Sequence, residues 1–99
     1  MNVKTDSIAL GLLEVDPSAY TASWDGQEVM LSATEIEILT ALIANSSKVS
    51  SRKELADAVG RQERTIDVLI SGLRHKIGPD FVRNVRGRGW ILNKRLMEA

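Results

Sequence analysis

The segment Glu63–Asn93, ERTIDVLISGLRHKIGPDFVRNVRGRGWILN, holds the pattern that decides the fold. Its first half carries apolar residues at helical spacing, at positions 66, 70, 73 and 77, before Gly78-Pro79 ends the pattern. Its second half has two strand-like runs, 81–86 and 89–93, joined by a tight turn at Gly87-Arg88. The segment therefore predicts an amphipathic helix, from Glu63 to Ile77, followed at once by a β-hairpin.

Two capping boxes stand upstream of this segment, at Ser32-Ala-Thr-Glu35 and at Ser51-Arg-Lys-Glu54. In a capping box the Ser hydroxyl and the Glu carboxylate satisfy free amides of the first helical turn. Apolar residues at helical spacing follow each box: Ile36, Leu39, Leu42 and Ile43 after the first, and Leu55, Ala58 and Val59 after the second. Gly60 fits the C-terminal cap of the second helix.

Residues 8–31 are expected to form a small antiparallel sheet. Four strand-like runs occur there, at 8–11, 12–15, 20–24 and 27–31, and Asp25-Gly26 suits a two-residue hairpin. The predicted class is α+β, with a four-stranded sheet, three helices and a C-terminal hairpin. We expect one domain over 1–99, with 1–7 as a tail or linker, 8–31 as the sheet, 32–78 as the three helices and 81–93 as the hairpin.

Composition limits the function classes. The chain has 99 residues, 43% hydrophobic and 26% charged, which is typical of a single globular domain. It has no cysteine, and its one histidine, His75, cannot build a typical zinc site. No apolar run reaches the roughly 20 residues that span a bilayer. We expect no metal, no cofactor, no membrane partner and a cytoplasmic location.

Charge is unevenly distributed along the chain. The whole is neutral, with 13 Lys/Arg and 13 Asp/Glu, yet residues 1–60 hold four basic and nine acidic side chains. Residues 61–95 hold nine basic and only three acidic ones. A basic third of a chain can mark a nucleic-acid surface. From charge alone, a solvated basic surface is an equal alternative.

The side of the predicted helix opposite its apolar stripe carries the candidate DNA-reading residues. At about 100° per residue, that side and its flanks comprise Arg64, Thr65, Val68, Leu69, Ser71, Gly72, Arg74 and His75. The major groove admits one α-helix. The arginines can bond phosphates or guanine, and Thr65 and Val68 can touch a thymine methyl group.

The hairpin adds a second set of cations. Arg86 and Arg88 beside its turn can reach phosphates or enter a narrow minor groove, where the negative potential is greatest. Trp90 can pack its ring on the core with its indole N–H facing outward. A nucleotide-binding loop at Gly-Arg-Gly is excluded, because no helix follows these glycines to bind an anion.

The sequence shows neither a facing pair of carboxylates nor a Ser–His–Asp arrangement of the kind that enzymes use. Glu35 and Glu37 are two positions apart on a helix and do not face each other. His75 lies on the basic side of its helix, away from a Ser–His–Asp arrangement. Asp67 and Arg74 are expected to form a surface pair. We therefore predict no catalytic residue and no enzyme.

Four segments together resemble one known family. They are Leu31-Ser-Ala-Thr-Glu-Ile-Glu-Ile-Leu39, Val49-Ser-Ser-Arg-Lys-Glu-Leu55, Arg64-Thr-Ile-Asp-Val-Leu-Ile-Ser-Gly-Leu-Arg74 and Val85-Arg-Gly-Arg-Gly-Trp90. The chain resembles the effector domain of OmpR/PhoB-type response regulators, a winged helix-turn-helix. The resemblance implies that the third helix reads the major groove of double-stranded DNA and that Arg86 approaches the minor groove. It also implies transcriptional regulation, often by head-to-tail dimers on direct repeats.

The chain departs from that family at three points. Leu69 stands where the family usually has His, and Ser71 and Gly72 stand where basic residues are common. Only Gly60–Gln62 separate the second and third helices, so the family's longer loop there, implicated in contacting RNA polymerase, is cut short. No segment resembles a receiver, so the chain is either an excised effector domain or a stand-alone regulator. Because the third helix is less cationic than the family's, a protein-interaction module with little DNA binding stays open as the alternative.

Overall fold

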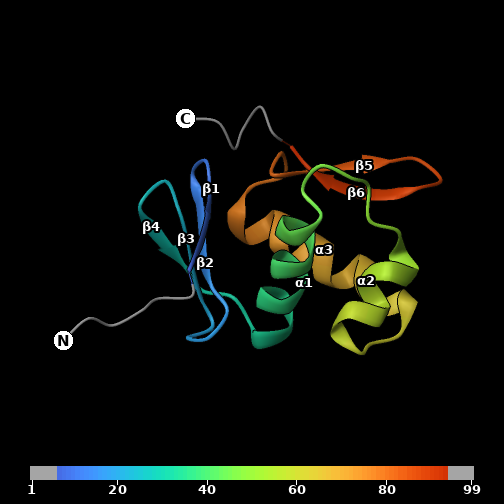
Figure 1. Cartoon of the computed structure of the whole chain (residues 1–99), viewed down its shortest axis with the longest axis horizontal. Coiled ribbons are helices and arrows are strands. Elements are labelled where there is room, and N and C mark those ends of the chain that lie inside the picture. Colours follow the sequence, from blue (N-terminus) through green and yellow to red (C-terminus); the bar gives the residue numbers. More distant parts are fainter. Residues whose placement is uncertain (1–6, 94–99) are drawn as a thin grey trace.

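The computed structural model describes residues 7–93 as four strands, three helices and a C-terminal hairpin. Figure 1 shows the sheet at one end, the helices in the middle and the hairpin extending over the other end. This confirms the predicted α+β class. The elements are, in order, β1 (Ile8–Leu10), β2 (Leu13–Asp16), β3 (Thr21–Trp24), β4 (Gln27–Val29), α1 (Ala33–Ala44), α2 (Arg52–Val59), α3 (Glu63–Ile77), β5 (Val82–Val85) and β6 (Gly89–Leu92).

The N-terminal sheet is antiparallel in the order β1-β2-β3-β4. The hairpin predicted at Asp25-Gly26 is confirmed, because both residues have positive φ, 52° and 80°, as a two-residue hairpin turn requires. Leu13 and Val15 are buried while Glu14 between them is exposed, so one face of the sheet packs on the helices. The strand predicted to begin at Tyr20 begins one residue later, since Tyr20 has a φ of 56° and belongs to the turn.

Both predicted capping boxes are present. Ser32 N–H donates to Glu35 Oε1 at 2.9 Å, and Glu35 N–H donates to Ser32 Oγ at 3.2 Å. Ser51 and Glu54 make the same two bonds at the start of α2, at 2.8 and 3.0 Å. These bonds satisfy amides that have no partner inside the helix, and so fix where each helix begins.

The predicted second helix and its glycine cap are confirmed, and its apolar residues differ in burial. Gly60 caps α2 in the left-handed conformation, as expected. Ala58, however, is exposed, and Ala56 is the buried alanine beside Leu55. Val59 is partly buried, so Leu55 and Val59 of the three predicted apolar positions pack on the core.

One core joins the sheet, the three helices and the hairpin. Ile66, Ile70 and Leu73 are buried on α3 as predicted, and Ile77 is partly buried against them. Among the described residues, the largest fully buried side chains come from four elements and the segment before β5: Leu13, Val15, Ile36, Ile38, Leu39, Leu42, Leu55, Ile66, Leu73 and Phe81. Burial of these side chains fixes α3 against α1 and α2.

The C-terminal hairpin, called the wing below, comprises β5, β6 and the three-residue loop Arg86–Arg88. Val85 pairs with Gly89, and Arg88 N–H donates to the Val85 carbonyl at 2.8 Å, so the loop is one residue longer than predicted. The connection between α1 and α2 pairs with β6 of the wing through one antiparallel bridge. Ser50 and Trp90 exchange two backbone bonds, at 2.8 and 2.9 Å, which attach the wing to the helices.

Candidate nucleic-acid interface

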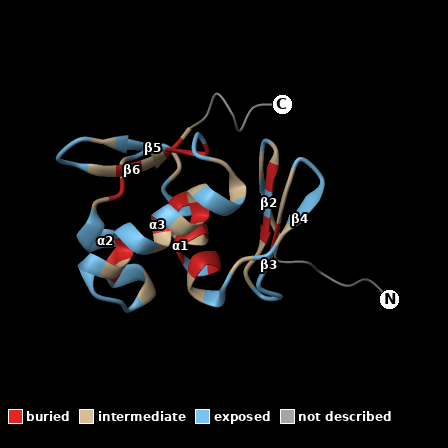
Figure 2. Ribbon diagram, turned by 180° about the vertical axis from the view of Figure 1, so that it is seen from behind, coloured by how far each residue is buried: buried red, intermediate tan, exposed pale blue. Residues whose placement is uncertain are grey.

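The outer side of α3 carries the exposed residues Arg64, Val68, Ser71 and His75, with exposed Asp67 at its edge toward α2 and partly buried Thr65 on the other flank. They recur at helical spacing and leave the apolar stripe of α3 to the core. Val68 is 70% exposed, so its methyl groups are open to contact on this face. Figure 2 marks further exposed residues along α2 and the wing loop. The predicted outer face is therefore present, but it is narrower than the sequence suggested.

Gly72 does not belong to that outer face. A Cβ atom at Gly72 would lie 2.6 Å from Glu35 Oε2, so the position faces α1. Leu69, predicted on the flank, packs partly against the core. The predicted placement of Gly72 on the outer face was wrong, because the Glu35 carboxylate of α1 lies against this position.

Glu35 links α1 to the last turn of α3. Its carboxylate is 8% exposed, and Lys76 Nζ donates to its Oε1 at 2.7 Å. Burial opposes ionisation of Glu35, but the bonds from Lys76 and from Ser32 outweigh burial and hold the pKa of this carboxyl below its ordinary value. Gly72 leaves the space that the carboxylate occupies. The capping box of α1 therefore also positions α3.

Arg74 ties α3 to the wing instead of pairing with Asp67. Its Nη2 donates to the Val82 carbonyl at 3.1 Å, at the start of β5. The predicted Asp67–Arg74 pair was wrong: seven residues along a helix separate two positions by about 10 Å. Asp67 pairs instead with Arg52 of α2, at 3.2 Å. Arg74 therefore holds the end of α3 against the start of β5.

Arg52 is the cation that sequence reasoning missed. It is the first residue of α2, and its guanidinium carbon lies 5.6 Å from the ring centroid of Trp90. The signal was available, because the capping box at Ser51 places the next residue at the exposed start of a helix. Trp90 itself is only 6% exposed, so its ring packs on the core as predicted and supports Arg52 from below.

The wing loop and the start of α2 form a basic cleft. Arg86 and Arg88 are exposed at the loop, and they line the cleft together with Arg52 and Lys53. One acidic residue, Glu63, shares the lining. Arg52 also lines a second cleft with Asp67 and Ser71, so cations from α2 and from the wing meet beside the outer side of α3. A polyanion lying across the three elements would contact all of them.

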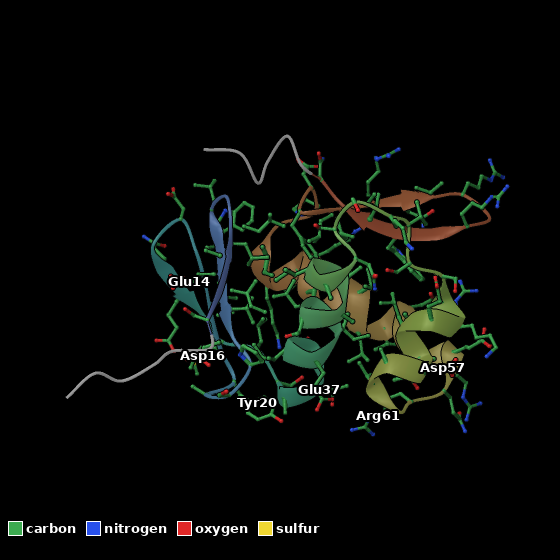
Figure 3. The ribbon with its side chains drawn as sticks, viewed as in Figure 1. Glu14, Asp16, Tyr20, Glu37, Asp57 and Arg61 are labelled. Carbon is green, nitrogen blue, oxygen red and sulfur yellow. The ribbon has the colours of Figure 1, made fainter. Side chains whose placement is uncertain are left out.

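Acidic side chains gather over other elements. Figure 3 labels Glu14 and Asp16 at the sheet and Glu37 on α1, away from the wing, whereas Asp57 on α2 pairs with Lys53 of the basic cleft at 3.1 Å. Within residues 7–93 no three His, Asp or Glu side chains are grouped so as to hold a metal ion. None of the helices in the same residues is long and apolar enough to cross a membrane.

Residues 26–92 match the family described as "Transcriptional regulatory protein, C terminal". The chain belongs to this family. It is 34% identical over 89 residues to the response regulator protein PmrA of Pseudomonas aeruginosa, a match that covers 85% of this chain and 40% of PmrA. The chain thus spans about two fifths of the length of this curated relative. The family is one of transcription regulators, not a class of enzymes.

Two solved DNA-binding domains share this fold. The DNA-binding domain of CpxR from Escherichia coli has a TM-score of 0.77 and 31% identity, covering 89% of this chain and 96% of that domain. The RstA DNA-binding domain of Klebsiella pneumoniae, solved in complex with the RstA box, has a TM-score of 0.77 and 26% identity over 90% of this chain and 98% of that one. The predicted winged helix-turn-helix and the resemblance to OmpR/PhoB-type effector domains are confirmed.

Proposed function

We propose that this domain binds double-stranded DNA sequence-specifically and regulates transcription. In the proposed complex, the outer side of α3 enters the major groove and Arg86 of the wing loop approaches the neighbouring minor groove. The observation that carries the proposal is the meeting of cations from the wing loop and from α2 beside the exposed side of α3. The solved RstA relative, which holds its own DNA box, supports it.

The residues have different expected roles. Arg64 reads a base edge, because an arginine can bond guanine in two places. Thr65 and Val68 contact thymine methyl groups, while Ser71, His75 and Arg88 contact the backbone. Arg74, Leu69 and Trp90 hold the reading elements in place, since the first bonds the wing and the other two pack on the core. Gly72 lies against Glu35 and has no proposed contact with DNA.

The domain is proposed to act as the effector part of a response regulator or as a stand-alone regulator, and as a homodimer on repeated half-sites. Its turn between α2 and α3 is short, and Arg61 there donates to the Thr34 hydroxyl at 3.1 Å, back against α1. We expect any contact with RNA polymerase to use a different surface. A cross-link from Gln62 to polymerase in an active promoter complex would contradict this.

The test begins with selection of bound duplexes from a random-sequence pool. The selected duplex is then titrated at several salt concentrations with wild type, Arg64→Ala, Arg86→Ala and Arg88→Ala. Each wing variant should weaken binding to all sequences alike and reduce the salt slope by about 0.9 for each phosphate that the variant no longer neutralises. Arg64→Ala should cost about 1–3 kcal/mol at one base pair.

Arg61→Ala is the matched control. It also removes one arginine, but this arginine bonds Thr34 at the start of α1 and does not line the basic cleft. It should leave both affinity and salt slope unchanged. Absence of DNA binding even at low salt would overturn the proposal and support a protein-interaction module, for which the exposed Val68 would then be the contact.

A further inference from the structure

The Arg52–Asp67 pair joins α2 to the outer side of α3. Arg52 Nε lies 3.2 Å from Asp67 Oδ1, and Arg52 Nη2 lies 3.3 Å from Asp67 Oδ2. The guanidinium therefore meets the carboxylate in two places, the geometry in which it also binds a phosphate. Both side chains are about half exposed, at 48% and 54%, so a ligand can reach either of them.

Arg52 stands where a DNA backbone would cross. It lines two adjoining clefts: one beside the wing loop, and one of about 330 Å³ shared with Ser71, Asn84 and Trp90. If α3 occupies a major groove and the wing the next minor groove, the strand between the two grooves passes over these clefts. A backbone phosphate then arrives within reach of Arg52, while the Trp90 ring holds the guanidinium from behind.

Two anions then compete for one guanidinium. If the phosphate takes Arg52, Asp67 loses its partner and faces the DNA as an unpaired carboxylate beside other negative charges. If Asp67 keeps Arg52, the phosphate is not neutralised. The conflict ends only where a base edge offers the carboxylate a hydrogen-bond donor, as the exocyclic amine of cytosine does in the major groove.

We propose that Asp67 is a specificity-determining residue: it withholds Arg52 from phosphate until a base-edge donor in the major groove takes its carboxylate. This inference rests on the proposed DNA binding and adds a mechanism of discrimination to it. Non-specific DNA meets a domain whose Arg52 is occupied. The correct sequence releases Arg52, which then neutralises one more phosphate.

The experiment compares wild type with Asp67→Ala on the selected duplex and on a scrambled duplex of the same composition, across a salt series. Asp67→Ala should strengthen binding to the scrambled duplex several-fold and steepen its salt slope by about 0.9, the value for one additional neutralised phosphate. It should not strengthen binding to the selected duplex. The ratio of the two affinities should therefore fall.

Two further variants separate release of Arg52 from simple loss of negative charge. Glu63→Gln removes one negative charge from the same helix without freeing an arginine. Because Glu63 lines the basic cleft, this variant should strengthen binding to both duplexes alike and leave their affinity ratio unchanged. In the Arg52→Gln background, Asp67→Ala should no longer steepen the salt slope. The pair is exposed, so these variants should stay folded, which thermal unfolding checks.

The outcomes divide clearly. The inference is overturned if Asp67→Ala strengthens binding to both duplexes equally. It is also overturned if Asp67→Ala steepens the salt slope as much in the Arg52→Gln background as in wild type, because Asp67 then acts only as a repelling charge. If wild type binds the selected duplex with discrimination, the proposed function stands even when the inference fails. If no duplex is selected at all, the proposed function fails and the inference falls with it.

Discussion

Gly89 shows how a single residue can determine the attachment of the wing. Its φ is 143°, a conformation that side chains rarely adopt, and a Cβ atom there would overlap the carbonyl of Ser50. The close approach is what allows Ser50 and Trp90 to exchange backbone bonds. Gly87, by comparison, has a φ of 76° with open space around it.

Gly89→Ala should therefore lower the free energy of unfolding by about 2–6 kcal/mol, since a strained φ costs about 1–3 kcal/mol and steric overlap adds a similar amount. Gly87→Ala should cost only about 1–2 kcal/mol, for the left-handed backbone alone. Urea unfolding of both variants measures the difference. Equal destabilisation would show that contact with Ser50 is not the constraint at Gly89.

Val68 offers a second test at the scale of one side chain. Replacing a contacted thymine by deoxyuridine removes one methyl group and leaves the hydrogen bonds of the base unchanged. Wild type should lose roughly 0.8 kcal/mol of binding free energy, the value for burying one such group. Val68→Ala should lose less at the same thymine.

The measurement is a scan of deoxyuridine through the thymines of the selected duplex with both proteins. If no thymine distinguishes wild type from Val68→Ala, then Val68 does not read a methyl group. Thr65→Ser is the companion variant, because it removes the other methyl group predicted to contact thymine and retains the hydroxyl.

At the scale of elements, local signals predicted each element's type and most of its position. The two capping boxes, the Asp25-Gly26 turn and the apolar spacing of α3 all depend on residues close in sequence, and all are present. Gly72 and Asp67 were misplaced because their surroundings come from other elements, α1 and α2. A helical pattern shows which stripe is apolar, but it does not show which neighbour crosses beside that stripe.

The Glu35 carboxylate gives the contact between α1 and α3 a pH dependence. Its pKa in the folded state is below the ordinary 4.5, so it contributes stability above that pH, and the contribution is lost as the pH falls through the folded-state pKa. Glu35→Gln retains a capping-box acceptor but removes the charge that Lys76 meets. It should cost about 1–3 kcal/mol of unfolding free energy at pH 7.

Glu54→Gln is the matched control, since it alters the other capping box, whose carboxylate is exposed. It should cost less than Glu35→Gln at neutral pH. The gap between wild type and Glu35→Gln should close as the pH falls below about 4.5. Unfolding curves at pH 7 and pH 3 test this, and a gap that stays constant with pH would exclude ionisation of Glu35 as its cause.

The whole molecule separates its charges along its length. Figure 1 places the sheet and the wing loop at opposite ends, and Figure 3 shows Glu14 and Asp16 at the sheet. Arg86 and Arg88 lie at the other end. Two copies arranged head to tail on DNA would bring the acidic end of one toward the basic end of the next.

Few cations on α3 mean few neutralised phosphates, so one copy should bind one half-site weakly. We expect tandem half-sites to bind two copies cooperatively, with an increase in affinity on the order of ten-fold over independent sites. Titration of single and tandem half-sites at two salt concentrations checks this. Tight, specific binding of a single copy to one half-site would contradict it.

The bond between Ser50 and Trp90 also bears on the order of folding. The β5–β6 hairpin is local and can close within microseconds, but its attachment joins two residues forty positions apart, with α2 and α3 between them. Such a contact has a high entropic cost until the intervening helices are packed. We therefore expect the wing to dock last. Since docking places Trp90 beneath Arg52, a nascent domain would acquire its complete DNA-facing surface only in the final step of folding.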